Sequence, residues 1–375
     1  MAATRPHPVV EEPEEYAMAS TVTAPDVALD ERLFQATVGT LELFSIYLGR
    51  RLGLYEALRD HGPMTVRELA ARVGIDARYA REWLEQQAVA GILGVDEPTH
   101  PADERRYALP DGHRAALLDP EDPAHVAPFA DMLVGIAATL EEVVDAYRTG
   151  GGVPYHRYGT AFRQGQGAIN RPAFLTDLVR TWLPAADLDE RLRRAGARVA
   201  DVGCGHGWAA IAVARHYPRA IVVGVDADRA SVDEAREHAR AAQVEVTFLA
   251  EDAKMLPARG PFDVVLVLEA LHDLSHPVEV LRACRAALRT DGAVLVADEA
   301  VAERFVAPGD ELERMMFGWS VSHCLPASRV EPGSAAVGTA IRPGTVRELA
   351  RQAGYRGIEV VDVDGGFFRL YRLDP

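Results

Sequence analysis

Positive charge is scarce in this sequence of 375 residues. It holds 40 lysines and arginines, of which Lys254 is the single lysine, against 56 aspartates and glutamates, and its formal net charge at pH 7 is −16. Such an excess of negative charge repels phosphate backbones over the whole surface. The composition therefore excludes nucleic acid as a default partner.

Cysteines and long apolar runs are also few. Cys204, Cys284 and Cys324 are widely separated and form no CxxC pair, which argues against a disulfide framework or structural zinc and fits a reducing compartment. The N-terminus lacks a basic region followed by an apolar one, and no stretch approaches the ~20 apolar residues that span a bilayer. We expect a cytoplasmic protein without a membrane partner.

The first half of the chain begins with helical patterns that give way to short β signals. Thr65 and Glu68 form a capping box before an apolar run, and Asp76 is placed to cap a helix over 77–90. Two small strands are expected after it, at residues 91–94 and 106–109. Helix, turn, helix and two-stranded wing is the order of a winged helix.

Two features of this region concern partners. A broad apolar face is formed by Leu41, Leu43, Phe44, Tyr47, Leu48 and Leu52. It predicts either a subunit interface, and hence a homodimer, or burial within the same chain.

In the second helix of the winged helix, Glu82 and Glu85 cancel the charges of Arg78 and Arg81. The basic face that DNA binding requires is therefore absent from this helix.

Residues 120–195 read as mainly helical, with one interruption at 150–159. Three glycines and a proline there precede Tyr155, His156 and Tyr158. Glycine-rich loops that carry aromatic and hydrogen-bonding groups often serve as lids over active sites. The segment is interpreted either as a substrate lid or as a connector between domains.

From residue 197 onward, short apolar strands alternate with helical segments, which predicts a doubly wound parallel sheet. The expected strands are Arg198–Asp201, Ala220–Val225, Val244–Leu249, Phe262–Leu268 and Ala293–Ala297. Gly357–Asp364 and Phe367–Arg372 then form a terminal hairpin, which would place an antiparallel strand in the sheet.

A chain of this length suggests about two domains, or one domain with a sizeable extension. The patterns divide it into a flexible leader at 1–28, a winged-helix-like dimerisation domain at 29–119, a helical linker or lid region at 120–195 and a ligand-binding α/β domain at 196–375.

Each predicted strand of the central sheet is followed by an acid. These acids are Asp201, Asp226, Asp252, Glu269 and Asp298. Ligands of open α/β sheets bind beyond the carboxyl ends of the strands, so we expect the acids to surround a ligand site.

A glycine loop follows the first of these strands. Gly203, Gly205 and Gly207 allow the backbone to approach a ligand where any Cβ would clash. The spacing is GxGxG, and Trp208 stands where a dinucleotide fingerprint would place its last glycine. The loop therefore does not predict a pyrophosphate-binding site.

The acids after the second and third strands complete this site. Asp226 lies 19 residues after Gly207, where its carboxylate can accept both hydroxyls of a ribose, and Asp252 can receive an adenine amino group. Acid on every side suits a cationic sulfonium cofactor better than a pyrophosphate.

In combination, the glycine loop, the acid after the second strand and the acid–alanine turn after the third resemble class I S-adenosylmethionine-dependent methyltransferases over residues 197–375. The resemblance implies a Rossmann-like fold, with a seven-stranded, mostly parallel sheet whose last strand is antiparallel. The cofactor-binding residues would be Asp201, Gly203, Gly205, Gly207, Asp226, Ala227, Asp252, Ala253 and Glu269. The whole chain resembles two-domain bacterial methyltransferases whose winged-helix-like region dimerises and covers the substrate pocket.

The fourth strand is followed by His272 and Asp273, which match the first two positions of an HDW motif in related small-molecule O-methyltransferases. Leu274 replaces the tryptophan. The resemblance implies that His272 is a general base for a hydroxyl proton, and an imidazole of pKa ~6.5 is suited to that role. Asp298 at the next strand end is expected to orient it. Much of the acceleration in methyl transfer comes from positioning.

The leading hypothesis is methyl transfer from S-adenosylmethionine to a small molecule, most simply to oxygen, with no metal. A second hypothesis takes His272, Asp273 and His323 as a two-histidine, one-carboxylate metal site, as in related enzymes that C-methylate 2-oxo acids with iron. A third is a transcription regulator that senses the cofactor. A fourth is a cofactor-binding protein that has lost methyl transfer and catalyses another rearrangement.

Overall fold

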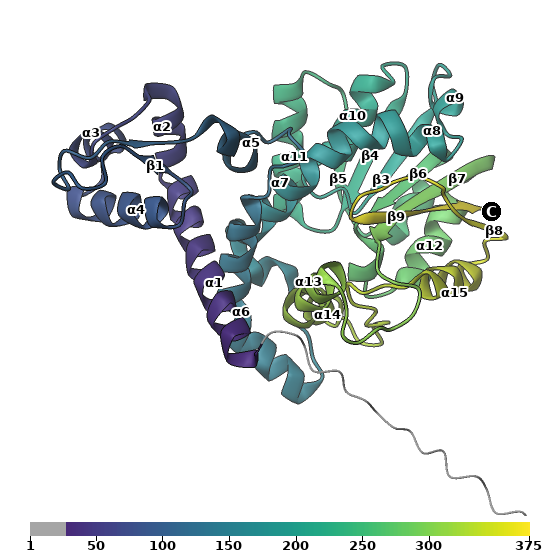
Figure 1. Cartoon of the computed structure of the whole chain (residues 1–375). Coiled ribbons are helices and arrows are strands. Elements are labelled where there is room, and N and C mark those ends of the chain that lie inside the picture. Colours follow the sequence, from purple (N-terminus) through teal and green to yellow (C-terminus); the bar gives the residue numbers. More distant parts are fainter. Residues whose placement is uncertain (1–27) are drawn as a thin grey trace, which may run out of the picture.

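The computed structural model describes residues 28–375, in which a small N-terminal body stands apart from a larger α/β body (Figure 1). Two long helices, α1 (Leu29–Arg51) and α6 (Pro128–Thr149), contact each other between the bodies. The leader predicted at residues 1–28 lies, except for Ala28, outside the described residues. Within residues 28–375, no helix is both long and apolar enough to cross a membrane.

The N-terminal body has the predicted winged-helix order. Its elements after α1 are α2 (Leu54–His61), α3 (Val66–Val73), α4 (Ala77–Val89), the antiparallel pair β1 (Gly94–Val95) and β2 (Tyr107–Ala108), η1 (Asp111–His113) and α5 (Arg114–Leu118). The Oγ1 atom of Thr65 accepts a hydrogen bond from the Glu68 amide at 3.4 Å, and Oε2 of Glu68 accepts one from the Thr65 amide at 2.8 Å. The predicted capping box is confirmed.

The segment between the two bodies is helical. After α6 it contains η2 (Tyr155–Tyr158), α7 (Gly159–Asp177), the π-helical turn η3 (Leu178–Trp182), α8 (Leu183–Ala185) and α9 (Asp189–Leu192). Helices α6 and α7 pack closely because glycines face the contact. A Cβ on Gly135 would lie 2.5 Å from the Cβ of Phe162, and a Cβ on Gly165 would lie 2.8 Å from the Cγ of Met132. The glycines thus bring α6 and α7 into close contact.

The α/β body is built on a seven-stranded sheet. Its strands are β3 (Arg198–Val202), β4 (Ile221–Asp226), β5 (Thr247–Ala250), β6 (Phe262–Leu268), β7 (Leu288–Glu299), β8 (Gly357–Val360) and β9 (Phe368–Asp374), in the order β5-β4-β3-β6-β7-β9-β8. Strand β9 pairs antiparallel with both β7 and β8. The predicted sheet and its antiparallel last strand are confirmed, although β5 begins later and β7 earlier than predicted.

Helices cover both faces of the sheet and bury its alternating side chains. They are α10 (Trp208–His216) and α11 (Arg229–Ala242) on one face, and α12 (Pro277–Ala286) and α15 (Pro343–Ala353) on the other. In β6, Val264 and Leu266 belong to the first core, while Val265 and Val267 belong to the second. The short helices η4 (Ala253–Ala258) and η5 (Leu271–Asp273) follow β5 and β6.

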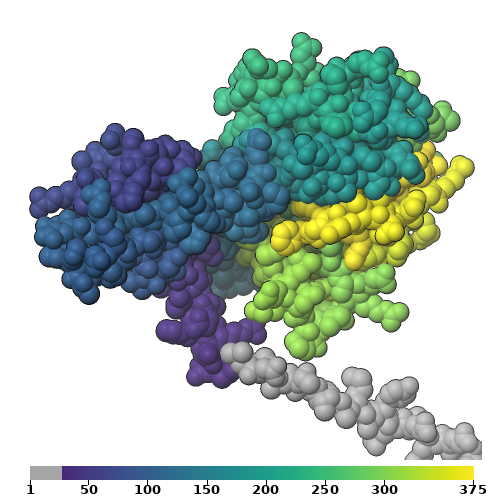
Figure 2. All heavy atoms as spheres, turned by 45° about the horizontal axis from the view of Figure 1, so that its top comes forward, coloured from purple at the N-terminus to yellow at the C-terminus, as the bar shows by residue number. Residues whose placement is uncertain are grey.

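A helical insertion separates β7 from α15. It contains α13 (Glu311–Trp319), the π-helical turn η6 (Ser320–Cys324) and α14 (Leu325–Ser328). In the space-filling view, this light green segment forms a lobe below the yellow C-terminal strands (Figure 2). It contacts α6 through the stacked rings of Phe129 and Trp319, whose centroids lie 5.8 Å apart. The insertion therefore closes the space between the carboxyl ends of the strands and α6.

Candidate active site

A cavity of about 360 Å³, here termed the strand-end cavity, lies beyond the carboxyl ends of β3 to β6. Among its lining residues are nine that the sequence predicts for the site: Tyr155, Gly203, Gly205, Asp226, Ala227, Asp252, Ala253, Glu269 and Asp273. The parallel strands bring these residues together because their carboxyl ends meet at one edge of the sheet. This is the position at which the sequence predicts a ligand.

The glycine loop forms one wall of the strand-end cavity. Gly203 and Gly205 have positive φ angles of 71° and 46°, and a Cβ on Gly203 would lie 2.7 Å from the Cβ of Ala270. A Cβ on Gly205 would meet nothing within 4 Å, so this glycine opens onto the cavity. Gly207 serves packing, since a Cβ there would lie 2.6 Å from the Cζ of Phe248.

Asp201 lies behind this wall. Its Oδ2 atom accepts a hydrogen bond of 3.2 Å from the amide of Ala210 in the first turn of α10, and its side chain is buried. Burial raises the pKa of Asp201 to about 7. Asp201 thus stabilises the first turn of α10. It does not line the strand-end cavity, where the sequence predicts it to bind the ligand.

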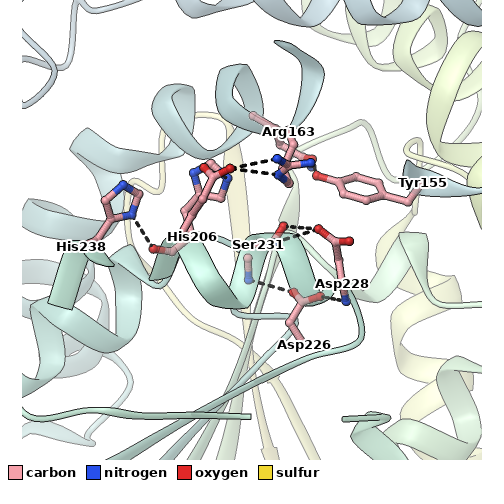
Figure 3. Close-up of polar contacts among 10 residues, drawn as sticks. Tyr155, Arg163, His206, Asp226, Asp228, Ser231 and His238 are labelled. Carbon is pink, nitrogen blue, oxygen red and sulfur yellow. Dashed lines mark hydrogen bonds and ion pairs between the residues drawn. The ribbon is translucent and has the colours of Figure 1, made fainter. Parts of the chain in front are cut away.

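Asp226 is held in a fixed orientation at the end of β4 (Figure 3). Its Oδ2 accepts a hydrogen bond from the amide of Gly205, and its Oδ1 accepts one from the amide of Asp228, each at 2.8 Å. Each carboxylate oxygen keeps a further acceptor site. Burial raises the pKa of Asp226, and the two amide bonds oppose this shift. The arrangement presents two fixed acceptors to a pair of ligand hydroxyls.

Asp252 lies at the end of β5 and is half exposed. Its Oδ1 accepts a hydrogen bond of 2.8 Å from the amide of Lys254, and its Oδ2 lies 3.1 Å from the Nζ of the same lysine. The only lysine of the sequence is thus engaged at this cavity. Asp252 retains acceptor capacity toward the cavity that it lines.

A second cavity of about 250 Å³, here termed the apolar cavity, adjoins the first. Its apolar walls come from α6, α7 and α13 and include Phe129, Met132, Phe162, Ile169, Met316 and Trp319. Its polar wall includes Glu269, His272 and Glu299. Gln166, Asn170 and Glu269 line both cavities. The two cavities therefore meet at these three side chains.

His272 is buried between two carboxylates. Its Nδ1 lies 2.6 Å from Oδ1 of Asp298, and its Nε2 lies 3.3 Å from Oδ1 of Asp273. Burial by itself would lower the pKa of His272, but Asp298 and Asp273 outweigh it and raise the pKa well above its ordinary value. The structure thus brings His272, Asp273 and Asp298 together, with His272 on the wall of the apolar cavity and Asp273 on that of the strand-end cavity.

His323 lies in an aromatic cluster. Its ring stacks on Phe162 with a centroid distance of 4.0 Å and meets the edge of Tyr158 at 4.4 Å. Burial lowers the pKa of His323 to about 3, so this imidazole is neutral at pH 7. Tyr158 itself is buried and donates a hydrogen bond of 3.3 Å to the Ser322 carbonyl.

Cys324, and not His323, lies beside His272 and Asp273. Ligand-type atoms of His272, Asp273 and Cys324 lie within 4.8 Å of one another, and the same holds for His272, Asp298 and Glu299. Across residues 28–375, no such group contains His323. Burial raises the pKa of the Cys324 thiol to about 12, so the thiol is protonated at pH 7. The two-histidine set that the metal hypothesis requires is not assembled in this arrangement.

Only one of the three predicted lid residues lines a described cavity. Tyr155 lines the strand-end cavity and donates a hydrogen bond of 2.9 Å to Oε1 of Gln166. Tyr158 contributes to the aromatic cluster, and His156 is exposed. A lid function of this segment remains a prediction.

Helix α7 contributes Arg163, Gln166 and Asn170 to the lining of the strand-end cavity. Nη2 of Arg163 lies 2.9 Å from Oε1 of Glu234 in α11, and Nε2 of His206 lies 3.4 Å from the other oxygen of Glu234. Gly167 allows this approach, because a Cβ there would lie 2.2 Å from Nδ1 of His206. The ion pair thus joins α7 to α11, with His206 of the glycine loop beside it, and the sequence motifs did not indicate this contact.

Two further site residues escaped the sequence analysis. Asn170 donates a hydrogen bond to Oε2 of Glu269, which has a positive φ of 49°. Glu299 follows Asp298 on β7 and lines the apolar cavity. Burial raises the pKa of Glu299 to about 8, and burial, followed by the charge of Glu299, raises the pKa of Glu269. In the sequence, Glu299 could have been recognised because it directly follows Asp298, an acid at the end of a predicted strand.

Two segments of the chain match known families. Residues 39–119 match the Rv2258c-like winged HTH domain, and residues 199–292 match a methyltransferase domain. Over 106 residues the chain is 30% identical to the ubiquinone biosynthesis O-methyltransferase of Coxiella burnetii, a match that covers 28% of this chain and 44% of that protein. A protein of the same description from Roseobacter denitrificans is 38% identical over 98 residues, with 26% and 39% covered. The chain thus spans less than half the length of these curated relatives.

Solved structures resemble the chain across both bodies. An O-methyltransferase family protein from Burkholderia thailandensis has a TM-score of 0.67 at 16% identity and covers 93% of this chain and 98% of its own. The mitomycin 7-O-methyltransferase MmcR gives 0.66 at 20% identity, with 92% and 97% covered. Human N-acetylserotonin methyltransferase, in complex with S-adenosylmethionine, gives 0.62 at 18% identity, with 94% and 99% covered. These likenesses show the fold, and the predicted class I methyltransferase fold is confirmed.

Proposed function

Because the chain joins a winged helix-turn-helix domain to a methyltransferase domain of the class I fold, we propose that it is an S-adenosylmethionine-dependent methyltransferase of a small molecule. The observation that carries the proposal is the paired orientation of Asp226 and the glycine loop beside a second, largely apolar cavity. We favour oxygen as the methylated atom, since His272 lies on the wall of that second cavity.

The residues of the strand-end cavity suit this cofactor. Asp226 would accept hydrogen bonds from both ribose hydroxyls, Asp252 one from the adenine amino group, and Gly205 leaves room for the methionine part. Glu269, whose pKa is raised by burial and by the charge of Glu299, lies at the boundary of the two cavities, and a bound cation there would favour its ionised form. Soaking crystals with S-adenosylhomocysteine tests this placement, and a ribose away from Asp226 would contradict it.

The apolar cavity would hold the acceptor, with its reacting hydroxyl toward His272. Asp298 accepts the hydrogen bond of Nδ1 and leaves Nε2 to take the hydroxyl proton. His272 becomes neutral more readily beside a cation, because like charges disfavour the imidazolium. When bound, S-adenosylmethionine would supply an electrophilic methyl carbon to the acceptor oxygen and would leave as S-adenosylhomocysteine. Gln166 and Asn170 would position the reacting groups at the junction of the cavities, and Asp273 would do so from the wall of the strand-end cavity.

The other hypotheses receive less support. The metal site expected for 2-oxo-acid methylation requires a second histidine beside His272 and Asp273, and His323 does not join them in a ligand group of residues 28–375. For a DNA-binding regulator, α4 would have to present a basic face. Instead, Arg78 pairs with Glu82 at 2.5 Å and Arg81 with Glu85 at 3.1 Å. We therefore propose a small-molecule enzyme that does not bind nucleic acid.

Helix α1 supports a homodimer as part of this proposal. Over its 23 residues it exposes a series of large apolar side chains, which includes Leu29, Leu33, Phe34, Leu41 and Leu48. An exposed apolar surface of this kind marks an interaction site more often than a free surface. The three cysteines are free, which fits the reducing cytoplasm that we propose as the location, and cell fractionation would test that location.

A further inference from the structure

The apolar cavity is lined by acidic groups but by no free basic group. Its lining, drawn from the described residues, contains Asp177, Glu269 and Glu299, and its basic groups are histidines, with no arginine or lysine. Burial lowers the pKa of His125 and lowers that of His323 to about 3, while His272 is already paired with Asp298 and Asp273. A carboxylate ligand would therefore find no free basic partner in this cavity, whereas a cation would meet acidic groups.

Glu299 is the residue best placed to receive such a cation. Glu299 is the last residue of β7 and follows Asp298 directly. Because successive side chains of a strand point to opposite faces of the sheet, the two acids face different surroundings. Asp298 bonds to His272, while Glu299 lines the apolar cavity with only 3% of its surface exposed to solvent. Within the part of the chain that the structure describes, no group donates a hydrogen bond to its Oε2 atom.

Burial raises the pKa of Glu299 to about 8, so without a ligand this unpaired carboxyl group is mostly protonated at pH 7. A ligand that brings a positive charge and a hydrogen-bond donor to this position favours the ionised form. Glu269, at the boundary of the cavities, faces the proposed cofactor position. Its charge is therefore available to the cationic cofactor, whereas Glu299 lines the apolar cavity only and stays available to the acceptor.

We propose that the acceptor carries a protonated amine, which Glu299 binds at the end of the apolar cavity. This inference rests on the proposed function, because it takes the apolar cavity as the acceptor site. The walls require that the rest of the molecule be apolar, with Phe129, Phe162 and Trp319 suited to an aromatic ring. A cavity of ~150 Å³ holds benzene, so about 250 Å³ accommodates a ring and a short side chain. The acceptor class is thus a small aromatic amine.

Three probes of one shape test this inference. Tyramine, 4-ethylphenol and 3-(4-hydroxyphenyl)propionate share a phenol and an ethylene arm, and differ in a positive, absent or negative charge. The full-length protein, saturated with S-adenosylhomocysteine, is titrated with each probe by calorimetry. Tyramine should bind about tenfold more tightly than 4-ethylphenol, as expected for one hydrogen bond to a charged group. The propionate should bind most weakly.

Two variants assign the preference to one residue. Glu299→Gln should bind tyramine no more tightly than 4-ethylphenol, while Glu303→Gln, at an exposed glutamate four residues further on, should retain the preference. Equal affinities in the wild-type protein, tighter binding of the propionate or no binding of any probe would overturn the inference, even if S-adenosylhomocysteine binds. Failure of S-adenosylhomocysteine itself to bind would overturn the proposed function as well.

Discussion

Nδ1 of His272 lies 2.6 Å from Oδ1 of Asp298, and both side chains are buried. The contact joins the helical turn after β6 to the end of β7, two neighbouring parallel strands. A carboxylate bonded to one ring nitrogen fixes the orientation of an imidazole and raises the basicity of the other nitrogen. This relationship makes His272 the proposed base.

Replacement of His272 by alanine should lower the methylation rate by ~10²–10⁴-fold, the usual contribution of a general base. Affinity for S-adenosylhomocysteine should stay within about twofold, as the proposed base acts on the acceptor. The rate is measured as formation of S-adenosylhomocysteine with a tyramine-like acceptor. Full activity in His272→Ala would show that positioning alone suffices.

The rate should increase with pH. The carboxylates of Asp298 and Asp273 raise the pKa of His272 above its ordinary value, so the neutral imidazole that accepts a proton gains population only as the pH rises through this raised pKa. Asp298→Asn removes one of the charges and should move the rise toward lower pH. A profile that is flat between pH 6 and 9 would exclude the histidine as the base.

Unfolding of the ligand-free protein should also depend on pH through Asp201. Burial raises its pKa to about 7 in the folded state, against ~3.9 in an unfolded chain. The folded state then binds more protons between these values, so the free energy of unfolding decreases as the pH rises from about 4 to about 7. Denaturant titrations of Asp201→Asn should show a shallower decrease, and an unchanged slope would contradict the assignment.

Helix α1 gives a prediction on assembly. The wild-type protein should scatter light as a species of twice the chain mass of 40.7 kDa. Phe34→Arg combined with Leu41→Arg places charge on two side chains that are 65% and 59% exposed, and should give monomers with an unchanged thermal transition. The control is Tyr79→Arg on α4, another exposed aromatic position. If the α1 variant stays dimeric, the dimer interface does not lie on α1.

The central sheet and much of the strand-end cavity could be predicted from sequence, because both depend on local patterns. A glycine loop after an apolar strand and an acid at the end of the next have their positions set by the parallel sheet. Gly205 and Asp226 accordingly lie together, joined by a hydrogen bond of 2.8 Å. Asp201 belongs to the same pattern, yet its side chain turns to the amide of Ala210, and sequence does not show such a rotation.

The apolar cavity could not be predicted in the same way, since its residues come from distant segments. Asn170 and Glu269 are 99 residues apart and meet only when α7 crosses the strand ends. His323 and Cys324 are consecutive residues of η6, so they point in different directions, and η6 places the cysteine beside His272. Such contacts depend on how the helices pack on the sheet.

Calorimetric titration of the full-length protein with S-adenosylhomocysteine measures whether the strand-end cavity binds this cofactor through Asp226. We expect one site per chain, no comparable binding of NAD, and a loss of ~1.5–3 kcal/mol of binding free energy in Asp226→Ala, the usual contribution of hydrogen bonds to a charged group. The exposed Asp233→Ala on α11 serves as the control. Absence of binding, or an affinity in Asp226→Ala equal to that of the wild type, would exclude the proposed cofactor site.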